Sequence, residues 1–400
     1  MKKLFILLLV LCLAFAGVIS YVAYVPMPIA EEAAEEIPAY DGEEAQTAEE
    51  AAPAEPAYKG LDYEAILALH GEDEVVATLN GRDVTWQEYF YWLYMQASQA
   101  DSIYVYYGMT PDWNAEAADG LSLSQLCVEN AEYVLRQVDA IEKFSAENGI
   151  ELTEEDKAAI AAEIENEKLN LLGEEGDDEA FNAKLQELHM SRELYDRILN
   201  AGALMERGFT QLYGENGELA EAADVVAYLE ENQYMSAHHI LFMTIDPATG
   251  MKLEEEQVKE KLAQAQSVYE ELIAIEDDAE RLERFDALKA ELCEDTGKVA
   301  YPDGYTYTPG TMYPEFEAAC LAQEAYQVSE PVETGAGYHL VMTLPLDADA
   351  TVFTSGQPGS ARVMYSEAAF NAGIAEAIEG IELEKAEGFE EINLADFVLA

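Results

Sequence analysis

Basic residues are scarce in this sequence: 21 Lys and Arg stand against 81 Asp and Glu, which leaves a formal charge of −60 on 400 residues. Binding to nucleic acid needs clustered Lys and Arg that replace the counterions of the phosphates, so we expect no nucleic-acid partner. The acidic surplus would attract flexible cationic chains at long range. It also favours solubility in a salty or acidic surrounding, and we prefer this simpler interpretation.

Cysteine is scarce as well. Only Cys127, Cys293 and Cys320 follow the apolar N-terminal run, which itself contains Cys12. Their uneven spacing gives neither a disulfide framework nor a zinc-binding pattern, so the three can form one disulfide bond at most. The sequence therefore predicts no bound metal ion and no cofactor.

The N-terminus has the pattern of a secretory signal. Two lysines precede an uncharged run from Leu4 to Val25, which has about the 20-residue length of a membrane-spanning helix. Ala14-Phe15-Ala16 fits a cleavage site, but the run stays apolar beyond it. Residues 1–25 are thus either a cleaved signal peptide or an N-terminal membrane anchor. We expect an extracytoplasmic protein that is secreted or anchored to the cell membrane.

Residues 26–59 consist largely of Ala, Glu and Pro and contain almost nothing to bury. This composition predicts an acidic linker, which repulsion between its negative charges extends.

Residues 60–231 carry the pattern of a mostly helical domain. Residues 75–85 predict two short strands around the Asn80-Gly81 turn, because these residue types tolerate positive φ in a tight hairpin. Thr85 and Glu88 then form a Thr-x-x-Glu capping box that begins a helix rich in aromatic residues. Further helical patterns follow, one of them capped by Thr153. The segment contains no catalytic constellation.

Residues 232–346 hold three of the five histidines, each at the start of an apolar run that predicts a strand. The first run contains His238 and His239, and the last contains His339. Between them come two helical patterns, the loop Tyr301–Tyr305, and a third helix that begins near Pro314. The order strand, helix, helix, loop, helix, strand, strand predicts a small α+β domain.

This segment resembles the parvulin family of peptidyl-prolyl isomerases. The family shares a Ser-His-Ile-Leu strand, a Gly-Gln-Met-x-x-x-Phe-Glu loop-to-helix motif and a closing Gly-x-His, which correspond to His238–Leu241, Gly310–Glu317 and Gly337–His339. The hairpin before Thr85 and the junction Asn148–Asp156 are similar to the helical segment of extracytoplasmic foldases of the PrsA and SurA type. The resemblance therefore extends beyond the isomerase segment.

The resemblance implies an α+β fold in which a helical SurA-like chaperone domain carries an inserted parvulin domain. The parvulin domain is expected to be a four-stranded antiparallel sheet with surrounding helices. Residues 60–231 would form the helical domain, residues 232–346 the parvulin domain, and residues 347–400 a segment that returns to the helical domain. Apolar positions at helical spacing predict a helix in that last segment, from Tyr365 to about Glu384.

The catalytic roles that the resemblance implies fall on His239, Asp295 and His339. The two histidines match a pair that face each other in the strands behind the parvulin site. Asp295 falls where family members carry Cys or Asp beside the isomerising bond. Rotation about an X–Pro bond breaks no bond to carbon, so none of the three is expected to be a nucleophile.

The substrate-binding roles fall on Met312 and Phe316, which match the residues that hold the proline ring. They lie four residues apart at a helix start, so their side chains can converge on one face. Tyr305 and Tyr307 are the candidates for an apolar contact that the family takes from a leucine in Gly-Gly-Asp-Leu-Gly. Taken singly, such residues are usually core, and only the ordered set of motifs makes them site residues.

The leading hypothesis is an exported peptidyl-prolyl cis-trans isomerase and foldase that assists the folding of secreted proteins. Its partners would be unfolded or partly folded secreted polypeptides with X–Pro bonds, and the membrane through the N-terminal segment. The unusual loop Tyr301–Tyr307 keeps an alternative open, a catalytically weak or inactive parvulin-like chaperone that only binds unfolded segments. A third hypothesis, an acidic surface protein, explains the linker and the charge but not the motifs.

Overall fold

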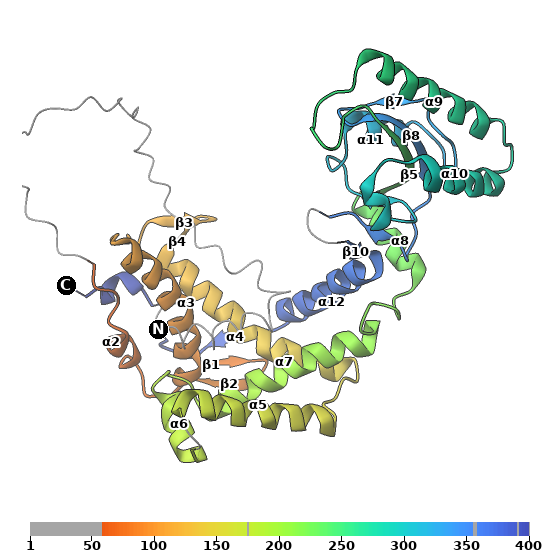
Figure 1. Ribbon diagram of the computed structural model, residues 1–400. Helices are drawn as coiled ribbons and strands as arrows, with labels where there is room; N and C mark the ends of the chain where they lie inside the picture. Colours follow the sequence, from red (N-terminus) through yellow and green to blue (C-terminus); the bar gives the residue numbers. More distant parts are fainter. Residues whose placement is uncertain (1–57, 174–175, 355–357, 390–391, 400) are drawn as a thin grey trace, which may run out of the picture. The chain divides into compact units, whose positions relative to one another are not determined.

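A computed structural model describes residues 58–173, 176–354, 358–389 and 392–399 (Figure 1). The predicted signal or anchor and nearly all of the predicted linker lie outside the described residues. None of the described helices is long and apolar enough to cross a membrane. The chain forms two compact units, of which the first runs to Gly208 and resumes at Asn371, and the second comprises Phe209–Phe370.

The first unit is mostly helical, and its helices begin where the sequence supplies caps. Thr85 accepts a hydrogen bond from the Glu88 backbone N–H, and Ser122 and Thr153 form capping boxes with Gln125 and Asp156. The elements in chain order are α2 (Tyr63–Leu67), β1 (Val75–Leu79), β2 (Arg82–Thr85), α3 (Trp86–Tyr107), β3 (Glu116–Ala118), β4 (Leu121–Ser122), α4 (Leu123–Glu147), α5 (Glu154–Leu172), α6 (Asp178–Gln186) and α7 (Arg192–Tyr213), whose last turn enters the second unit.

The Glu88 side chain was predicted to cap the start of α3 together with Thr85, but it takes part in an ion-pair network instead. Its carboxylate lies 2.9 Å from Arg82 Nη1 and 3.3 Å from Arg197 Nη1, and both arginines also reach Asp139, at 2.7 and 3.1 Å. The two carboxylate side chains are each 12% exposed, so solvent screens this network less than a surface ion pair. The network connects the hairpin to α3, α4 and α7.

The far end of the chain completes the sheet of the first unit. Its strand order is β11-β1-β2, and β11 (Leu383–Lys385) pairs antiparallel with β1 so that Lys385 lies opposite Ala77. The predicted helix is therefore wrong at its end, because α12 (Ala361–Glu379) stops before β11 begins. Strand pairing with β1, some 300 residues earlier, overrides the helical pattern there. After β11, η3 (Leu394–Phe397) is followed by Val398, which bridges to Leu61.

The second unit is built on a six-stranded sheet of order β10-β9-β6-β5-β8-β7. Its elements are α8 (Ala222–Glu231), β5 (Met235–Met243), α9 (Glu255–Ile273), α10 (Asp278–Leu292), η2 (Thr296–Val299), β6 (Tyr305–Tyr307), α11 (Pro314–Leu321), β7 (Val332–Glu333), β8 (Gly337–Leu344), β9 (Thr351–Val352), β10 (Gly359–Ser360) and the first half of α12. The α+β class is confirmed, and residues 232–346 supply four strands of this sheet, which β9 and β10 extend to six. The expected four, β6-β5-β8-β7, are antiparallel, and β9 adds a parallel pairing to β6.

The two extra strands come from the segment that we assigned to the C-terminal return. Phe353 N–H donates to Thr306 O at 2.7 Å, which holds this segment against β6. The compact second unit thus includes residues on both sides of the range 232–346. The domain boundaries given above remain predictions.

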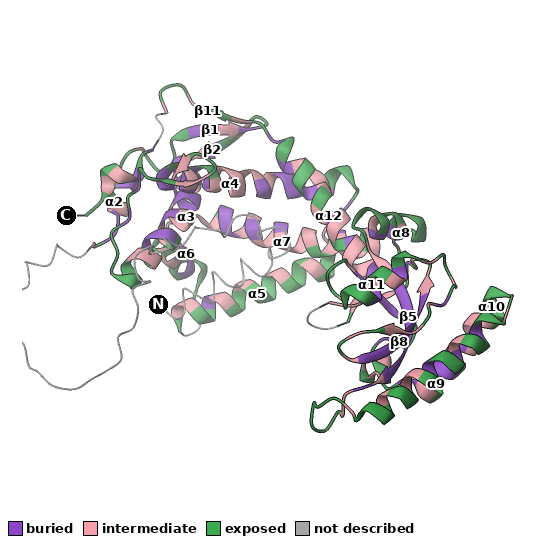
Figure 2. Ribbon diagram, turned by 90° about the horizontal axis from the view of Figure 1, so that it is seen from above, coloured by how far each residue is buried: buried purple, intermediate pink, exposed green. Residues whose placement is uncertain are grey.

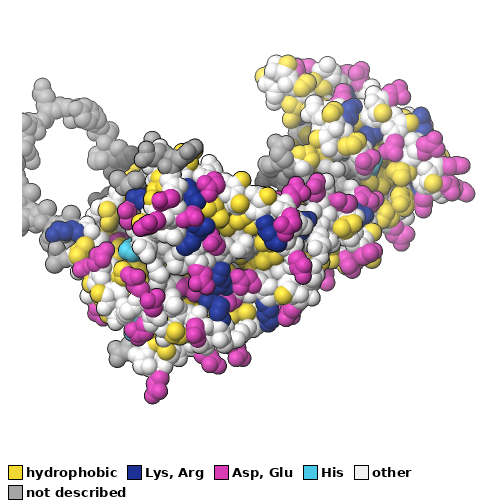
Figure 3. Space-filling view, turned by 90° about the horizontal axis from the view of Figure 1, so that it is seen from below, with side chains coloured by type: hydrophobic (Ala, Val, Ile, Leu, Met, Phe, Trp, Pro, Cys, Tyr) yellow, Lys and Arg dark blue, Asp and Glu magenta, His cyan; other side chains and the backbone are white. Residues whose placement is uncertain are grey.

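Helices cover both faces of the sheet in the second unit (Figure 2). Helices α9 and α10 pack on the face of β5 that carries Ile240 and Phe242, and α11 packs on the face that carries Ala237. Successive residues of a strand point to opposite faces, so His238 faces α10 and His239 faces α11. Acidic side chains are spread over the surface visible in Figure 3, with Lys and Arg between them.

Candidate active site

The two predicted histidines lie together at the centre of the sheet. His239 is in the middle of β5 and His339 is in β8, where the register places them diagonally: His239 pairs with Val341, and Leu241 pairs with His339. Their ring centroids are 5.1 Å apart, at 70° between the ring planes. Both side chains are buried, His239 at 9% and His339 at 4% exposure. The sheet register therefore brings together residues that are 100 positions apart.

Asp295 joins this pair from the loop after α10, where it caps η2. Its carboxylate accepts hydrogen bonds from His239 Nε2 at 3.0 Å, from the Tyr305 hydroxyl at 2.6 Å and from the Gly297 N–H at 2.9 Å. Burial alone would raise the pKa of Asp295, but the hydrogen bonds from His239 and Tyr305 hold this pKa well below its ordinary value. Burial alone would lower the pKa of His239, and the hydrogen bond with Asp295 raises it instead.

His339 has the opposite electrostatic setting. Burial, together with the nearby charge of His239, lowers the pKa of His339 to about 3, so its ring is neutral at physiological pH. Its Nε2 lies 2.9 Å from Thr334 Oγ1, which also accepts a hydrogen bond from the Ala336 N–H in the turn before β8. The pair thus contains one histidine that favours the charged form and one that favours the neutral form. Sequence reasoning missed Thr334, although it stands five residues before His339.

An aromatic cluster covers the histidine pair. The Phe316 ring meets His239 and His339 edge-on, at centroid distances of 5.4 and 5.6 Å. Tyr307 lies 6.0 Å from Phe316 and is fully buried, and Tyr305 is buried beside His239. The structure therefore brings the predicted residues together, but it places Tyr307 in the core behind Phe316.

Met312 lies at the outer side of this cluster. Its side chain is partly buried and packs against the cluster that contains Phe316. The loop before α11 is held by Glu317, whose carboxylate accepts hydrogen bonds from the Met312 N–H at 2.9 Å and the Gly310 N–H at 3.0 Å. The neighbouring Tyr313 is 47% exposed. The Tyr313 ring lies 6.3 Å from the His339 ring, so this ring and the flexible thioether side chain of Met312 border the cluster.

Two further residues shape the site and were not predicted from the sequence. Phe353 packs edge-on against Tyr301 and Tyr305, which are themselves stacked at 4.6 Å. Cys293, a buried free thiol, accepts a hydrogen bond from the Leu241 N–H at 3.4 Å. Phe353 had no signal because the tail gave no reason to place it against the loop. Across the parts of the chain that the structure describes, no group of three or more His, Cys, Asp or Glu is arranged to hold a metal ion.

Comparisons with known proteins address the same segment. Residues 239–344 match the family model described as "Rotamase: PPIC-type PPIASE domain". The match begins at His239 and contains every predicted site residue. This part of the chain is a parvulin-type peptidyl-prolyl isomerase domain, and the resemblance drawn from its motifs is confirmed.

Two curated relatives are each called "Foldase protein PrsA". The protein of Halalkalibacterium halodurans is 27% identical over 201 residues, which cover 49% of this chain and 52% of the relative. That of Oceanobacillus iheyensis is 26% identical over 213 residues, which cover 53% of this chain and 59% of the relative. The chain thus matches somewhat more than half the length of these relatives.

Among solved structures, PrsA from Bacillus subtilis is 17% identical, covers 78% of this chain and 92% of its own, and gives a TM-score of 0.24. PrsA from Lactococcus lactis is 15% identical, covers 77% of this chain and 90% of its own, and gives a TM-score of 0.22.

Proposed function

From the parvulin-type domain at residues 239–344 we propose that this protein is an exported foldase that isomerises X–Pro bonds in unfolded or partly folded secreted polypeptides. The observation that carries the proposal is the buried pair of His239 and His339 beneath Phe316, with Asp295 hydrogen-bonded to His239. Export rests on the N-terminal pattern of residues 1–25 alone.

The proposed chemistry is non-covalent. Rotation about the peptide bond has a barrier of roughly 18–20 kcal/mol because the planar amide is stabilised by resonance. A twisted amide has lost this charge separation and is less polar, so apolar surroundings disfavour it less than they disfavour the planar form. Phe316 and Met312 supply such surroundings, with Met312 as a side chain that can move aside to admit the proline ring.

Within this proposal the polar residues hold the apolar contact in place. Asp295 fixes the orientation of the His239 ring, and Thr334 fixes that of the His339 ring. Both imidazole rings therefore contact Phe316 in one orientation. Tyr305 acts through its hydrogen bond to Asp295, and the fully buried Tyr307 supports Phe316 from behind. None of these groups forms a bond to the substrate.

A prolyl-isomerisation assay with the full-length protein tests the proposal, using peptides that vary in the residue before proline. We compare Phe316→Leu with Phe285→Leu, because both rings are buried in the second unit and Phe285 lies in the cluster on the other sheet face. Both changes remove a similar apolar area, so their effects on stability should be similar. Only Phe316→Leu should lose activity, because only Phe316 contacts the histidine pair. Absence of acceleration by the folded wild-type protein with every peptide would leave the inactive chaperone as the better description.

A further inference from the structure

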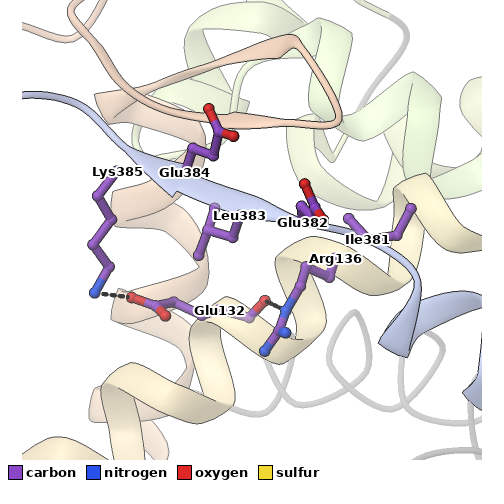
Figure 4. Close-up of a pocket in the computed structure, with 7 residues that line it drawn as sticks. All are labelled: Glu132, Arg136, Ile381, Glu382, Leu383, Glu384 and Lys385. Carbon is purple, nitrogen blue, oxygen red and sulfur yellow. Dashed lines mark hydrogen bonds and ion pairs between the residues drawn. The ribbon is translucent and has the colours of Figure 1, made fainter.

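A groove in the first unit lies beside β11, at the edge of the β11-β1-β2 sheet. It has a volume of about 490 Å³, within the range of ligand sites in proteins. Figure 4 shows its lining, which comes from α4 and the end of the chain: Glu132, Arg136 and residues 381–385. All of these residues belong to the first unit, so the groove is separate from the candidate active site.

The strand beside the groove has an open backbone edge. Glu382 and Ala386 bond to the side of β1, through Asn80 N–H to Glu382 O at 3.1 Å and Ala386 N–H to Val76 O at 2.9 Å. Bonding groups alternate along an antiparallel pair, so Leu383 and Lys385 turn their N–H and C=O groups away from β1. No other described residue pairs with that edge. Such an edge is a template for a further strand.

The lining of the groove carries three carboxylates, of Glu132, Glu382 and Glu384, and two cations, Arg136 and Lys385. Lys385 Nζ lies 2.8 Å from Glu132 Oε1, so this carboxylate is already matched. Arg136 donates from Nε to the Glu132 backbone oxygen at 3.1 Å, and its two terminal nitrogens have no partner among the described residues. In a chain of charge −60, an arginine without a carboxylate partner is unusual. A guanidinium with two unused nitrogens matches the geometry of a carboxylate.

We propose that this groove binds an extended polypeptide segment, which adds to the open edge of β11 as a strand and places an acidic side chain against Arg136. The proposal rests on the proposed foldase function, since an unfolded client chain is the ligand. Strand addition suits such a ligand because its affinity comes from backbone hydrogen bonds that every sequence can make. Arg136 adds a preference for segments that carry a carboxylate at the matching position.

Fluorescence anisotropy with the full-length protein tests this, using a labelled peptide rich in Thr and Val with one central Glu. A second peptide carries Gln in place of the Glu, and a third has N-methylated backbone amides. Arg136→Gln removes the guanidinium, and Lys157→Gln is its control, because Lys157 is an exposed cation on α5 of the same unit. Leu383→Pro removes an N–H that faces the open edge and leaves the bonds to β1, and Leu383→Thr keeps that N–H.

Arg136→Gln should weaken binding of the Glu peptide about tenfold, the size of one lost charge-assisted hydrogen bond, and leave the Gln peptide unaffected. Leu383→Pro and N-methylation should each abolish binding of both sequences, while the two control variants bind as the wild type does. The proposal would be overturned if Arg136→Gln and Leu383→Pro bound the Glu peptide as tightly as the wild type does, or if the wild type did not bind it. Tighter peptide binding after deletion of residues 26–57 would assign the groove to the chain's own linker and would also overturn it.

These outcomes are independent of the isomerase. The groove variants lie in the first unit and should leave isomerisation of short prolyl peptides unchanged. Peptide binding with the expected pattern in a protein that does not isomerise proline would reject the proposed enzymatic activity and keep the groove.

Discussion

Replacing Asp295 by asparagine probes the histidine pair most directly, because it keeps the size of the side chain and removes its charge. The Asp295 side chain is 20% exposed and accepts hydrogen bonds from His239, Tyr305 and Gly297. His239 and Tyr305 both donate to Oδ2, and Gly297 donates to Oδ1, so the single oxygen of asparagine can serve only one of the two positions and its NH₂ group faces the donors at the other. A hydrogen bond to a charged group contributes about 1.5–3 kcal/mol, so we expect the second unit to lose on the order of 3 kcal/mol of unfolding free energy.

The loss should depend on pH in both directions. Asp295 has a lowered pKa in the folded state, so its stabilisation is present above its unfolded pKa of about 3.9 and is lost as the pH falls. His239 has a raised pKa, so its stabilisation is complete below about 6.5 and is lost as the pH rises through the folded value. The difference between wild type and variant should therefore be largest between about pH 4 and pH 6.5.

The second unit can be followed by the NMR signals of its histidine rings during urea unfolding. The three tryptophans, Trp86, Trp92 and Trp113, all lie in the first unit, and their fluorescence serves as an internal reference. The pKa of His239, measured by NMR titration, should fall in Asp295→Asn. Asp303→Asn, an exposed change in the same loop region, is the matched control. Equal unfolding free energies for wild type and Asp295→Asn near pH 5, or an unchanged His239 pKa, would refute the reasoning.

Three further changes test other parts of the structure. Burial lowers the pKa of His339 to about 3, whereas an unfolded histidine binds a proton below about pH 6.5, so protonation of His339 favours the unfolded state as the pH falls. The variant His339→Gln should therefore lose less stability than the wild type between about pH 6 and pH 4. An identical pH dependence of the urea midpoint in the two proteins would contradict this. Gly337→Ala should separate β8 from β5 at a cost of several kcal/mol, because φ is 153° and a Cβ there would lie 2.2 Å from Phe242 O. The control Gly335→Ala lies in the same turn and should fold normally, because the nearest contact of its added Cβ is at 3.4 Å. Equal melting temperatures for the two variants would argue against the strain. Truncation after Gly380 removes β11 and should lower the tryptophan unfolding midpoint of the first unit while the histidine signals of the second unit keep theirs; an unchanged tryptophan midpoint would show that β11 contributes little.

Much of the candidate site was predictable because its residues carry short motifs. The strand signals around His239 and His339 and the proline at the start of α11 depend on local sequence, and the structure places these elements as expected. The capping residues Thr85 and Thr153 were equally accessible, since a helix N-cap is decided by a side chain and a backbone N–H three residues apart. Composition alone argued against a nucleic-acid partner.

What the sequence could not determine depends on contacts between distant residues. The open edge of β11, the position of Phe353 over Tyr301, and the return of residues 383–385 to β1 involve partners far away in the chain, and short polar segments give no signal of which strand they will join. The electrostatic contrast within the histidine pair is likewise tertiary. The two histidines have opposite pKa shifts because the fold places the Asp295 carboxylate within hydrogen-bond distance of His239, whereas the side-chain partner of His339 is the neutral hydroxyl of Thr334.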